Sequence, residues 1–363
     1  MPDRIFLVHG MGNYPDGWAK PWVDGLRSLY QSYDPLARTP FAERFKVVPI
    51  GYDEIFRTIV QRWQQDATSI GAAAPSVGAA RVEALVGWLR TAAVVDDNFA
   101  WTHCADVLLY YLFPAVRDAV RVHVAKQVAT EVATLKADES WSVLAHSLGT
   151  AVSHDALHLL WSGTFPDGQP TGFNAKDDKA LLVAMIANVS RVLEDQPDVY
   201  ESTVMPGPAR ATDRGCFYYL NARHVLDPFT IPRAFDPAAW PDAKSVAQGL
   251  YRRVLVEHIQ DWNVHDFLHY LRNPRVHIPL FRTLTYDRAI PAAQEAAALA
   301  KFKPFGRLTT DQAVAIKTWL EKRAPAFSDT WDVLRVVWDW YYAGPAAAPA
   351  GVVAATPAGG PGD

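Results

Sequence analysis

Short apolar runs alternate along this chain with longer segments whose apolar residues recur at helical spacing. Six of the runs are rich in β-branched or aromatic residues, as buried strands are, and they cover residues 5–8, 46–50, 141–145, 182–186, 217–221 and 253–258. Strands separated by helical segments are typical of a parallel sheet with crossover helices. The pattern therefore predicts an α/β fold, with a mostly parallel central sheet flanked by helices.

The second and third runs are separated by roughly ninety residues, far more than one crossover connection requires. Two segments of this stretch carry apolar residues three and four apart, as on one face of an amphipathic helix: Val82, Leu85, Val86 and Leu89, then Val107, Leu108, Tyr111 and Leu112. From Pro114 to about Leu135, valines recur every fourth residue and predict a helix that leads back to the sheet. We therefore expect residues 54–113 to form a helical cap insertion over the strand ends.

The periodic signals weaken after residue 275. Helices over residues 310–322 and 328–342 fit the pattern, so residues 276–343 are expected to form a C-terminal helical extension. From residue 344 onward the chain is nearly all Ala, Pro, Gly and Val, a composition that predicts a disordered tail over 344–363. The core domain is then expected to comprise residues 1–53 and 114–275.

Composition and charge narrow the classes of partner. Half of the residues are hydrophobic and 13 are Trp, which is enough apolar material for a large core and an apolar cleft. The net charge of −4, without a long basic run, lacks the positive patch that a nucleic-acid phosphate backbone requires. We therefore expect no nucleic-acid partner.

Cysteine usage and hydropathy bear on the compartment. The two cysteines, Cys104 and Cys216, lie far apart and show no metal-ligand spacing. The N-terminal apolar run is too short for a secretory signal, and no stretch approaches the roughly 20 consecutive apolar residues of a membrane span. These features predict a soluble, cytoplasmic protein with no membrane span.

The third apolar run ends in Ala145-His146-Ser147-Leu148-Gly149. A strand that reverses sharply into a helix leaves almost no room for side chains two positions either side of the serine at its apex. This steric demand defines the nucleophile elbow, G-x-S-x-G. Here Ala145 replaces the first glycine and adds one methyl group. An ordinary strand-to-helix junction could carry the same residues, because short motifs also occur by chance.

A reacting serine also needs hydrogen-bond donors for the negative charge that develops on the substrate oxygen. The first apolar run is followed by His9-Gly10-Met11-Gly12-Asn13, whose glycines let the backbone turn and expose its amides. The backbone N–H of Met11 is the expected first donor. The N–H of Leu148, at the start of the helix after Ser147, is the expected second, assisted by the helix dipole.

The acid and the base are sought after later strands, because working residues of a doubly wound sheet gather at the strands' C-terminal ends. Asp227 lies shortly after the fifth run, and Pro228 stiffens its turn; Asp195, after the fourth run, is the rival acid. His265 follows the last run on a polar loop, with His269 one helical turn further on as the alternative base. The chain order Ser147, Asp227, His265 is that of the α/β-hydrolase triad.

On these motifs the chain resembles an α/β-hydrolase of the serine esterase and lipase group. The resemblance spans about residues 4–275 and rests on HGMG at 9–12, AHSLG at 145–149, the Asp227-Pro228 turn and Asn263-Val264-His265. It implies an α/β-hydrolase fold that lacks the two leading strands of larger members. It further implies that Ser147 is the nucleophile, His265 the base and Asp227 the orienting acid, with no metal and no organic cofactor.

The function that follows is hydrolysis of small-molecule carboxylic esters with an apolar acyl group. We expect the cap to line an acyl pocket with Trp63, Leu85, Trp88, Leu89, Trp101, Leu108 and Tyr111. Two alternatives stay open at this point. The same residues would serve a thioesterase or an amidase, and the fold alone could serve a binding protein without turnover.

Overall fold

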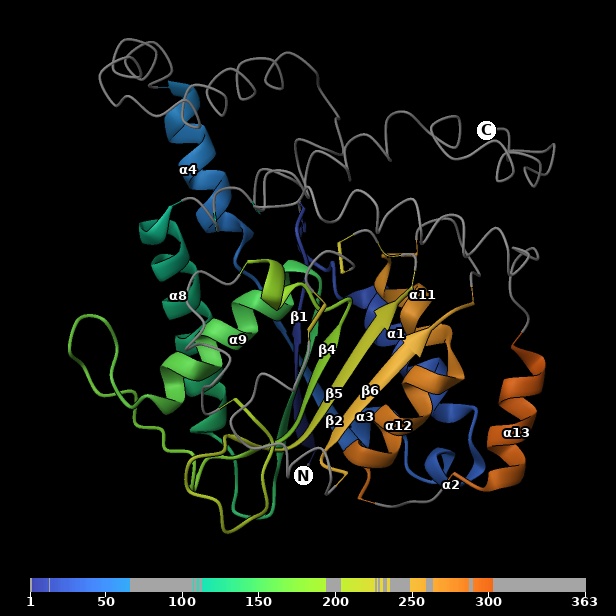
Figure 1. The fold of residues 1–363 in the computed structure, drawn as a ribbon. Coiled ribbons are helices and arrows are strands. Elements are labelled where there is room, and N and C mark those ends of the chain that lie inside the picture. Colours follow the sequence, from blue (N-terminus) through green and yellow to red (C-terminus); the bar gives the residue numbers. More distant parts are fainter. Residues whose placement is uncertain are drawn as a thin grey trace, which may run out of the picture.

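The computed structural model describes residues 2–12, 14–65, 107, 110, 113–193, 204–225, 227, 229–230, 234–235, 249–258, 264–286 and 290–302. Within these ranges the chain forms a six-stranded, all-parallel sheet in the order β2-β1-β3-β4-β5-β6 (Figure 1). The strands are β1 Asp3–Val8, β2 Phe45–Ile50, β3 Trp141–His146, β4 Ala180–Ile186, β5 Cys216–His224 and β6 Tyr251–Val256. Each coincides with one of the six predicted runs, so the predicted parallel α/β fold is confirmed.

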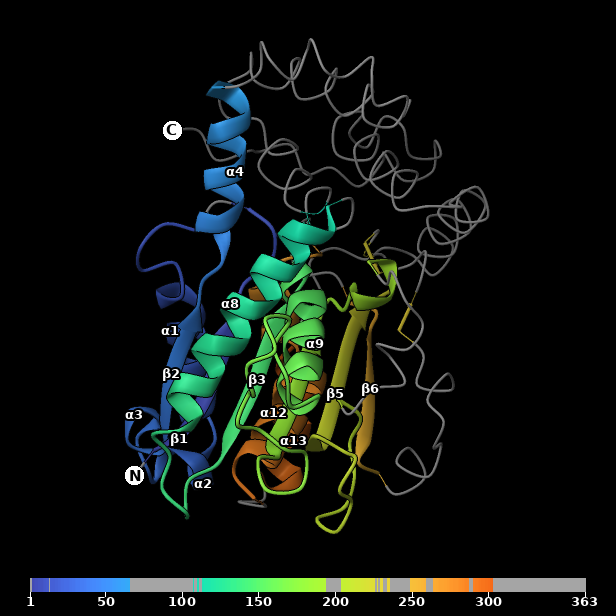
Figure 2. The ribbon, with the colours of Figure 1, turned by 90° about the vertical axis from the view of Figure 1, so that its left-hand side faces the viewer.

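Helices cover both faces of the sheet. On one face lie α8 Pro114–Val132 and α9 Leu148–Trp161, seen in front of the strands in Figure 2. The valines predicted along α8 do form its inner face, since Val116, Val120, Val124 and Val128 are buried. Both central strands, β3 and β4, are buried along their whole length. Burial on both faces explains why their sequences are continuous apolar runs rather than alternating ones.

The opposite face is covered by α1 Lys20–Gln31, α11 Phe267–Arg272 and α12 Pro274–Leu284 (Figure 1). The buried side chains of these helices pack against this face of the strands. They form a hydrophobic core cluster that is separate from the one beneath α8 and α9. Three further helices, α2 Asp34–Ala37, α3 Phe41–Arg44 and α13 Ala292–Lys301, lie on the same side. Because α12 packs into this cluster, the core continues past residue 275, where the sequence pattern had placed its end.

Only part of the expected cap lies within the described residues. Helix α4, Asp53–Gln65, leaves the end of β2, and Val107 and Tyr110 are buried against the core. A short 3-10 helix, Ser190–Val192, follows β4. The rest of the insertion, the helices expected over 310–322 and 328–342 and the tail over 344–363 lie outside the described residues. Among the described helices, none combines the length and hydropathy needed to cross a lipid bilayer.

A buried histidine in the core should make the fold sensitive to acid. Nε2 of His277 lies 2.6 Å from the Tyr33 hydroxyl, and Nδ1 lies 2.8 Å from the Leu271 carbonyl oxygen. A carbonyl only accepts, so Nδ1 donates and Nε2 of the neutral ring accepts from Tyr33. Burial lowers the pKa of His277 from 6.5 to about 4. Between these two pKa values the unfolded chain binds more protons than the folded protein. The contribution of the neutral His277 ring to the free energy of unfolding is therefore fully present above pH 6.5 and is lost as the pH falls towards 4.

We therefore expect the free energy of unfolding of His277→Gln to depend less on pH than that of the wild-type protein. Between pH 7 and pH 4.5 the wild type should lose on the order of 2 kcal/mol more than the variant. Urea unfolding at a series of pH values measures both slopes. Equal slopes would show that His277 does not titrate as its buried contacts predict.

Candidate active site

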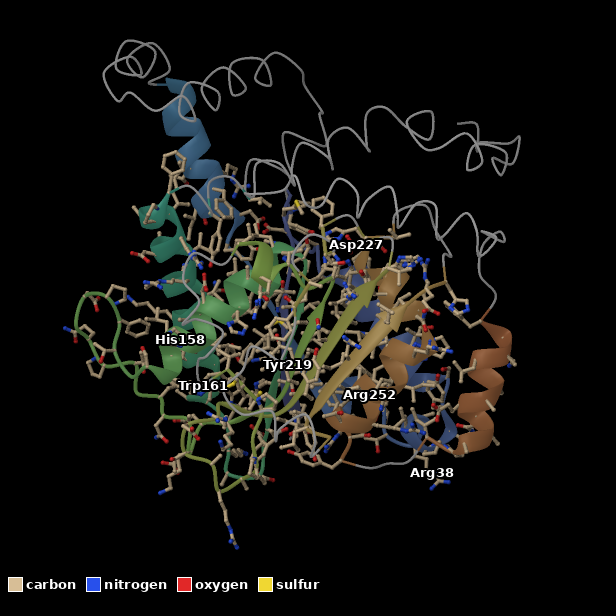
Figure 3. All side chains as sticks on the ribbon, in the orientation of Figure 1. Arg38, His158, Trp161, Tyr219, Asp227 and Arg252 are labelled. Atoms are coloured by element: carbon tan, nitrogen blue, oxygen red, sulfur yellow. The ribbon has the colours of Figure 1, made fainter. Side chains whose placement is uncertain are left out.

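The residues expected to act together lie at one end of the sheet. The loop after β1 carries Met11, β3 is followed by Ser147, β5 is followed by Asp227, and β6 is followed by His265. In Figure 3, Asp227 lies at the end towards which the strands point, whereas Arg38 lies at the opposite end. Parallel strands bring their C-terminal ends to one edge, so residues as far apart in the sequence as Ser147 and His265 become neighbours.

Ser147 occupies a sharp turn between β3 and α9. Its φ of 54° and ψ of −127° lie in a region that residues with a side chain rarely adopt. The turn is held by hydrogen bonds on both sides: the Ser147 N–H donates to the Ile186 carbonyl at 3.0 Å, and the Thr150 hydroxyl donates to the Ser147 carbonyl at 2.6 Å. Ala145 is fully buried in the core, where its extra methyl group is accommodated. The local geometry is that expected of a nucleophile elbow.

Gly149 lets the first turn of α9 approach the end of β1. A Cβ atom at this position would overlap the His9 carbonyl oxygen and would lie 2.9 Å from the carbonyl oxygen of Val8. Both obstacles are backbone atoms at the end of β1 and cannot swing aside as a flexible side chain could. The second small residue of the motif is therefore required by packing.

Gly149→Ala is accordingly expected to lower the free energy of unfolding by roughly 2–4 kcal/mol, as overpacking against a rigid neighbour does. Gly51→Ala is the matched control, because a Cβ there meets no atom within 4 Å, and it should be near neutral. Urea unfolding of the two variants measures the difference. Wild-type stability of Gly149→Ala would mean that α9 and β1 can separate without cost.

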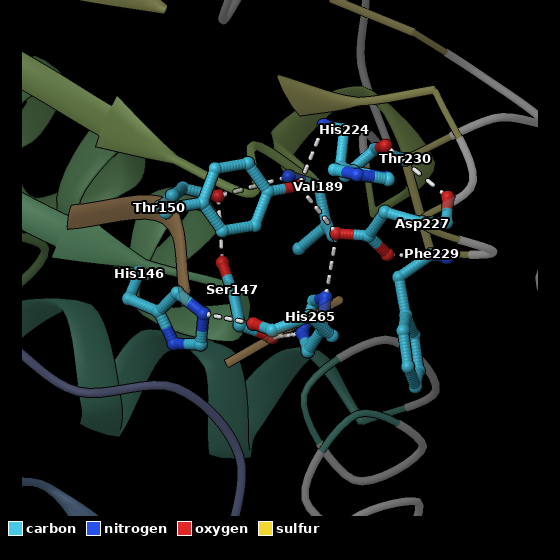
Figure 4. Close-up of polar contacts among 10 residues, drawn as sticks. His146, Ser147, Thr150, Val189, His224, Asp227, Phe229, Thr230 and His265 are labelled. Carbon is cyan, nitrogen blue, oxygen red and sulfur yellow. Dashed lines mark hydrogen bonds and ion pairs between the residues drawn. The ribbon is translucent and has the colours of Figure 1, made fainter. Parts of the chain in front are cut away.

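Three polar side chains form a continuous hydrogen-bonded chain (Figure 4). Nε2 of His265 lies 2.6 Å from Oγ of Ser147, and Nδ1 of the same ring lies 2.8 Å from Oδ2 of Asp227. The Ser147 and Asp227 residues are buried, whereas the His265 side chain is 15% exposed. The structure thus brings together the three residues that the sequence singled out, and it does so at hydrogen-bond distance.

The carboxylate of Asp227 has a partner for each oxygen. Oδ1 accepts the Phe229 N–H at 3.0 Å, and Oδ2 accepts the Tyr270 hydroxyl at 2.7 Å in addition to His265. Burial would by itself raise the pKa of Asp227, but the charge and hydrogen bond of His265, with those of Tyr270 and Phe229, outweigh it and lower that pKa below 3.8. Asp227 is therefore a carboxylate at neutral pH. Tyr270 gave no signal in the sequence, because its partner lies 43 positions away.

His146, beside the serine, fixes the backbone of the loop that carries His265. Its Nε2 lies 2.6 Å from the His265 carbonyl oxygen, so this nitrogen donates. Burial, followed by repulsion from His265, lowers the pKa of His146 from 6.5 to about 3 and keeps its ring neutral. Sequence reasoning assigned no role to His146.

One expected oxyanion donor, the Leu148 N–H, belongs to the residue after Ser147, and the other, the Met11 N–H, follows Gly10 in the loop after β1. A Cβ on Gly10 would lie 2.8 Å from the Cβ of Ser147, so the loop after β1 packs directly on the serine. Within the described residues, neither the Met11 N–H nor the Leu148 N–H donates a hydrogen bond to the protein. Two uncommitted amides beside a buried serine are suited to bind a negatively charged oxygen.

The rival assignments fare differently. The ring of His269 lies against those of His224 and Tyr270, with centroids 5.3 and 6.2 Å away, while the contact with Ser147 belongs to His265.

Asp195, Pro228 and Asn263 lie outside the described residues. So do the expected pocket residues Leu85, Trp88, Leu89, Trp101, Leu108 and Tyr111, while Trp63 lies in α4. In the described part of the chain, no three His, Cys, Asp or Glu residues are grouped to hold a metal ion.

Comparison with known proteins identifies no relative of this chain. No protein-family model matches the chain, and neither a curated protein nor a solved structure matches it. What the site does must therefore be inferred from its own geometry.

Proposed function

We propose that this protein is a serine hydrolase that cleaves carboxylic esters, with Ser147 as nucleophile, His265 as base and Asp227 as orienting acid. The observation that carries the proposal is the unbroken chain of contacts, 2.6 Å from Ser147 to His265 and 2.8 Å from His265 to Asp227. A serine hydroxyl is a weak nucleophile at neutral pH and reacts only beside a base that a third group orients. The hydrogen-bonded chain supplies the serine, the base beside it and the group that orients the base.

The protonation states assign the roles. Because Asp227 is ionised, it accepts a hydrogen bond from the Nδ1–H of His265, and this tautomer leaves Nε2 free to take the proton of Ser147. Oγ of Ser147 then attacks the ester carbonyl carbon, and His265 passes the proton to the departing alcohol. Water repeats the sequence on the acyl-enzyme, with His265 again as base, and the acid is released.

The tetrahedral intermediates carry a negative charge that the two free amides would bind. In this proposal the Met11 N–H, next to Gly10, and the Leu148 N–H are the two donors, and Leu148 begins a 14-residue helix whose dipole adds positive potential at that end. The preorganised donors need no rearrangement during the reaction.

The sequence of sites along the sheet supports an α/β-hydrolase fold as part of the proposal. The donor loop follows β1, the serine follows β3, the acid follows β5 and the base follows β6, in the chain order of that fold's triad. The helical cap over 54–113 and its apolar acyl pocket belong to the same proposal. This chemistry requires neither a metal nor an organic cofactor.

A panel of p-nitrophenyl esters from acetyl to palmitoyl, with acyl-CoA and anilide analogues of matched acyl length, tests the function. We expect turnover of at least one ester at a rate that exceeds that of its anilide. Turnover of the thioesters alone, or of the anilides alone, would keep the serine mechanism and change the leaving group. No turnover on any member, together with no reaction towards a fluorophosphonate, would contradict the proposal and favour a binding role.

A further inference from the structure

The loop that carries Met11 is fastened to the chain that follows β2. The parallel register pairs Val8 with Ile50, so the residues just after each strand lie side by side. The Tyr52 hydroxyl lies 2.7 Å from the His9 carbonyl oxygen and 2.9 Å from that of Gly10. The single hydroxyl proton is within reach of both carbonyl oxygens, and the Gly10 carbonyl belongs to the same peptide unit as the Met11 N–H.

Asp53 holds the same loop from its other end. Its Oδ2 accepts the Tyr14 N–H at 3.2 Å, and its Oδ1 lies 2.5 Å from Nε2 of His9. The His9 contact is close but poorly aligned for a hydrogen bond, and it becomes an ion pair when the imidazole is protonated. One carboxylate therefore joins the first and the last residue of the segment 9–14, called the oxyanion loop below.

Aromatic packing fixes the His9 ring that Asp53 contacts. The ring is stacked between those of Tyr14 and Tyr52, with centroids 4.2 Å away on each side, and Trp18 meets it edge-on at 5.0 Å. The residue is 1% exposed. The burial of Asp53 would raise its pKa, but the close contact with the His9 ring, with the backbone N–H groups of Asp53 and Tyr14, lowers it, so the carboxylate is ionised.

The position of this loop matters because it touches the serine. Gly10 packs against Ser147, and the next amide along the chain is that of Met11. A displacement of about 1 Å in a catalytic group can cost on the order of 10²-fold in rate. A device that holds the loop at both ends would act on the transition state, since the oxyanion exists only there.

We infer that Tyr52 and Asp53 are positioning residues for the reaction proposed above, and that they set where the Met11 N–H points by clamping the oxyanion loop at both ends. The inference rests on the proposed function. It assigns a role to the junction at which the chain leaves β2 for α4, upstream of the expected cap.

The test compares wild type, Asp53→Asn and Tyr52→Phe in the full chain. The Asn variant removes the charge but keeps the side-chain shape, and the Phe variant removes only the hydroxyl. Three quantities are measured: kcat and KM for p-nitrophenyl butyrate, the end-point of fluorophosphonate labelling as a count of competent serines, and the Ki of an alkyl trifluoromethyl ketone. That ketone adds to the serine and places an oxyanion between the donors.

We expect kcat per labelled serine to fall by roughly 10- to 100-fold in Asp53→Asn, and by less in Tyr52→Phe, with KM changed by less than about threefold. The Ki of the ketone should rise in parallel with the fall in kcat/KM. Asp24→Asn is the control: its carboxylate pairs with Lys20 and Arg27 on the exposed surface of α1, and it should behave as wild type.

Wild-type kcat in both clamp variants would overturn the inference. So would a lower kcat with an unchanged Ki, because that result would show a loss of rate that does not arise at the oxyanion. Should Asp53→Asn fail to fold, Tyr52→Phe alone decides, since it keeps the aromatic stack. If wild type neither turns over the ester nor binds the probe, the proposed function itself fails, and the inference fails with it.

Discussion

Ser147→Ala is expected to abolish ester turnover, with a fall in kcat on the order of 10⁶-fold, and to abolish labelling by a fluorophosphonate. The reason is geometric. Ser147 Oγ lies 2.6 Å from Nε2 of His265, and Ser147 occupies the apex of the turn between β3 and α9, with Gly10 packed against it. Without Oγ no acyl-enzyme can form, and only binding and the donors remain to accelerate attack by water.

Ser153→Ala provides the matched control for this prediction. Ser153 is a buried serine on α9, the helix that follows Ser147, and its hydroxyl has no hydrogen-bond partner among the described residues. The Ser153→Ala variant should be labelled by the fluorophosphonate and should turn over substrate, both at the wild-type rate. Labelling of Ser147→Ala at that rate would place the nucleophile elsewhere.

Asp227→Asn is expected to lower kcat by about 10⁴-fold while the protein stays folded. In this variant the side-chain amide nitrogen can occupy the position of Oδ2 and donate a hydrogen bond to Nδ1 of His265. This hydrogen bond favours the His265 tautomer that carries its proton on Nε2. In that tautomer Nε2 cannot accept the proton of Ser147. The Tyr270 hydroxyl would lose a charged acceptor as well. Turnover and thermal unfolding of the variant, measured together, separate loss of chemistry from loss of structure.

The assignment of His265 as the base is tested by measuring turnover in alanine variants of two histidines that lie one helical turn apart. His265→Ala should match the loss seen in Ser147→Ala, whereas His269→Ala should keep most of its turnover per folded molecule, because its ring packs against His224 and Tyr270 rather than on the serine. The reverse outcome for the pair would move the base to His269. A sensitive Asp195→Asn beside an insensitive Asp227→Asn would likewise move the acid.

The strands and the serine turn could be predicted because their causes are local. A strand buried on both faces must be apolar along its length, and a reversal as sharp as that at Ser147 admits only small neighbours such as Gly149. Such constraints are visible within about ten residues of sequence. The rule that functional residues gather at the C-terminal ends of parallel strands then directed the search for the acid and the base to Asp227 and His265.

Other parts of the structure depend on contacts between distant residues. Helix α12 contains Pro279, which disfavours a helix interior. Most of the side chains of α12 are nevertheless buried in the core, and this tertiary packing offsets the weak local signal. The pairing of Asp53 with His9 and of Tyr270 with Asp227 could not be read from the chain, because nothing in the spacing of these residues marks them as partners. They became visible only once the strand ends were brought together.

The covalent bond to Ser147 is the central claim, and peptide mapping tests it most directly. The full-length wild-type protein is treated with a fluorophosphonate to completion, digested and analysed by tandem mass spectrometry. We predict a single adduct per chain, on the side chain of Ser147, formed in step with the loss of ester turnover. An adduct on another residue, or complete loss of turnover without an adduct at Ser147, would contradict the account.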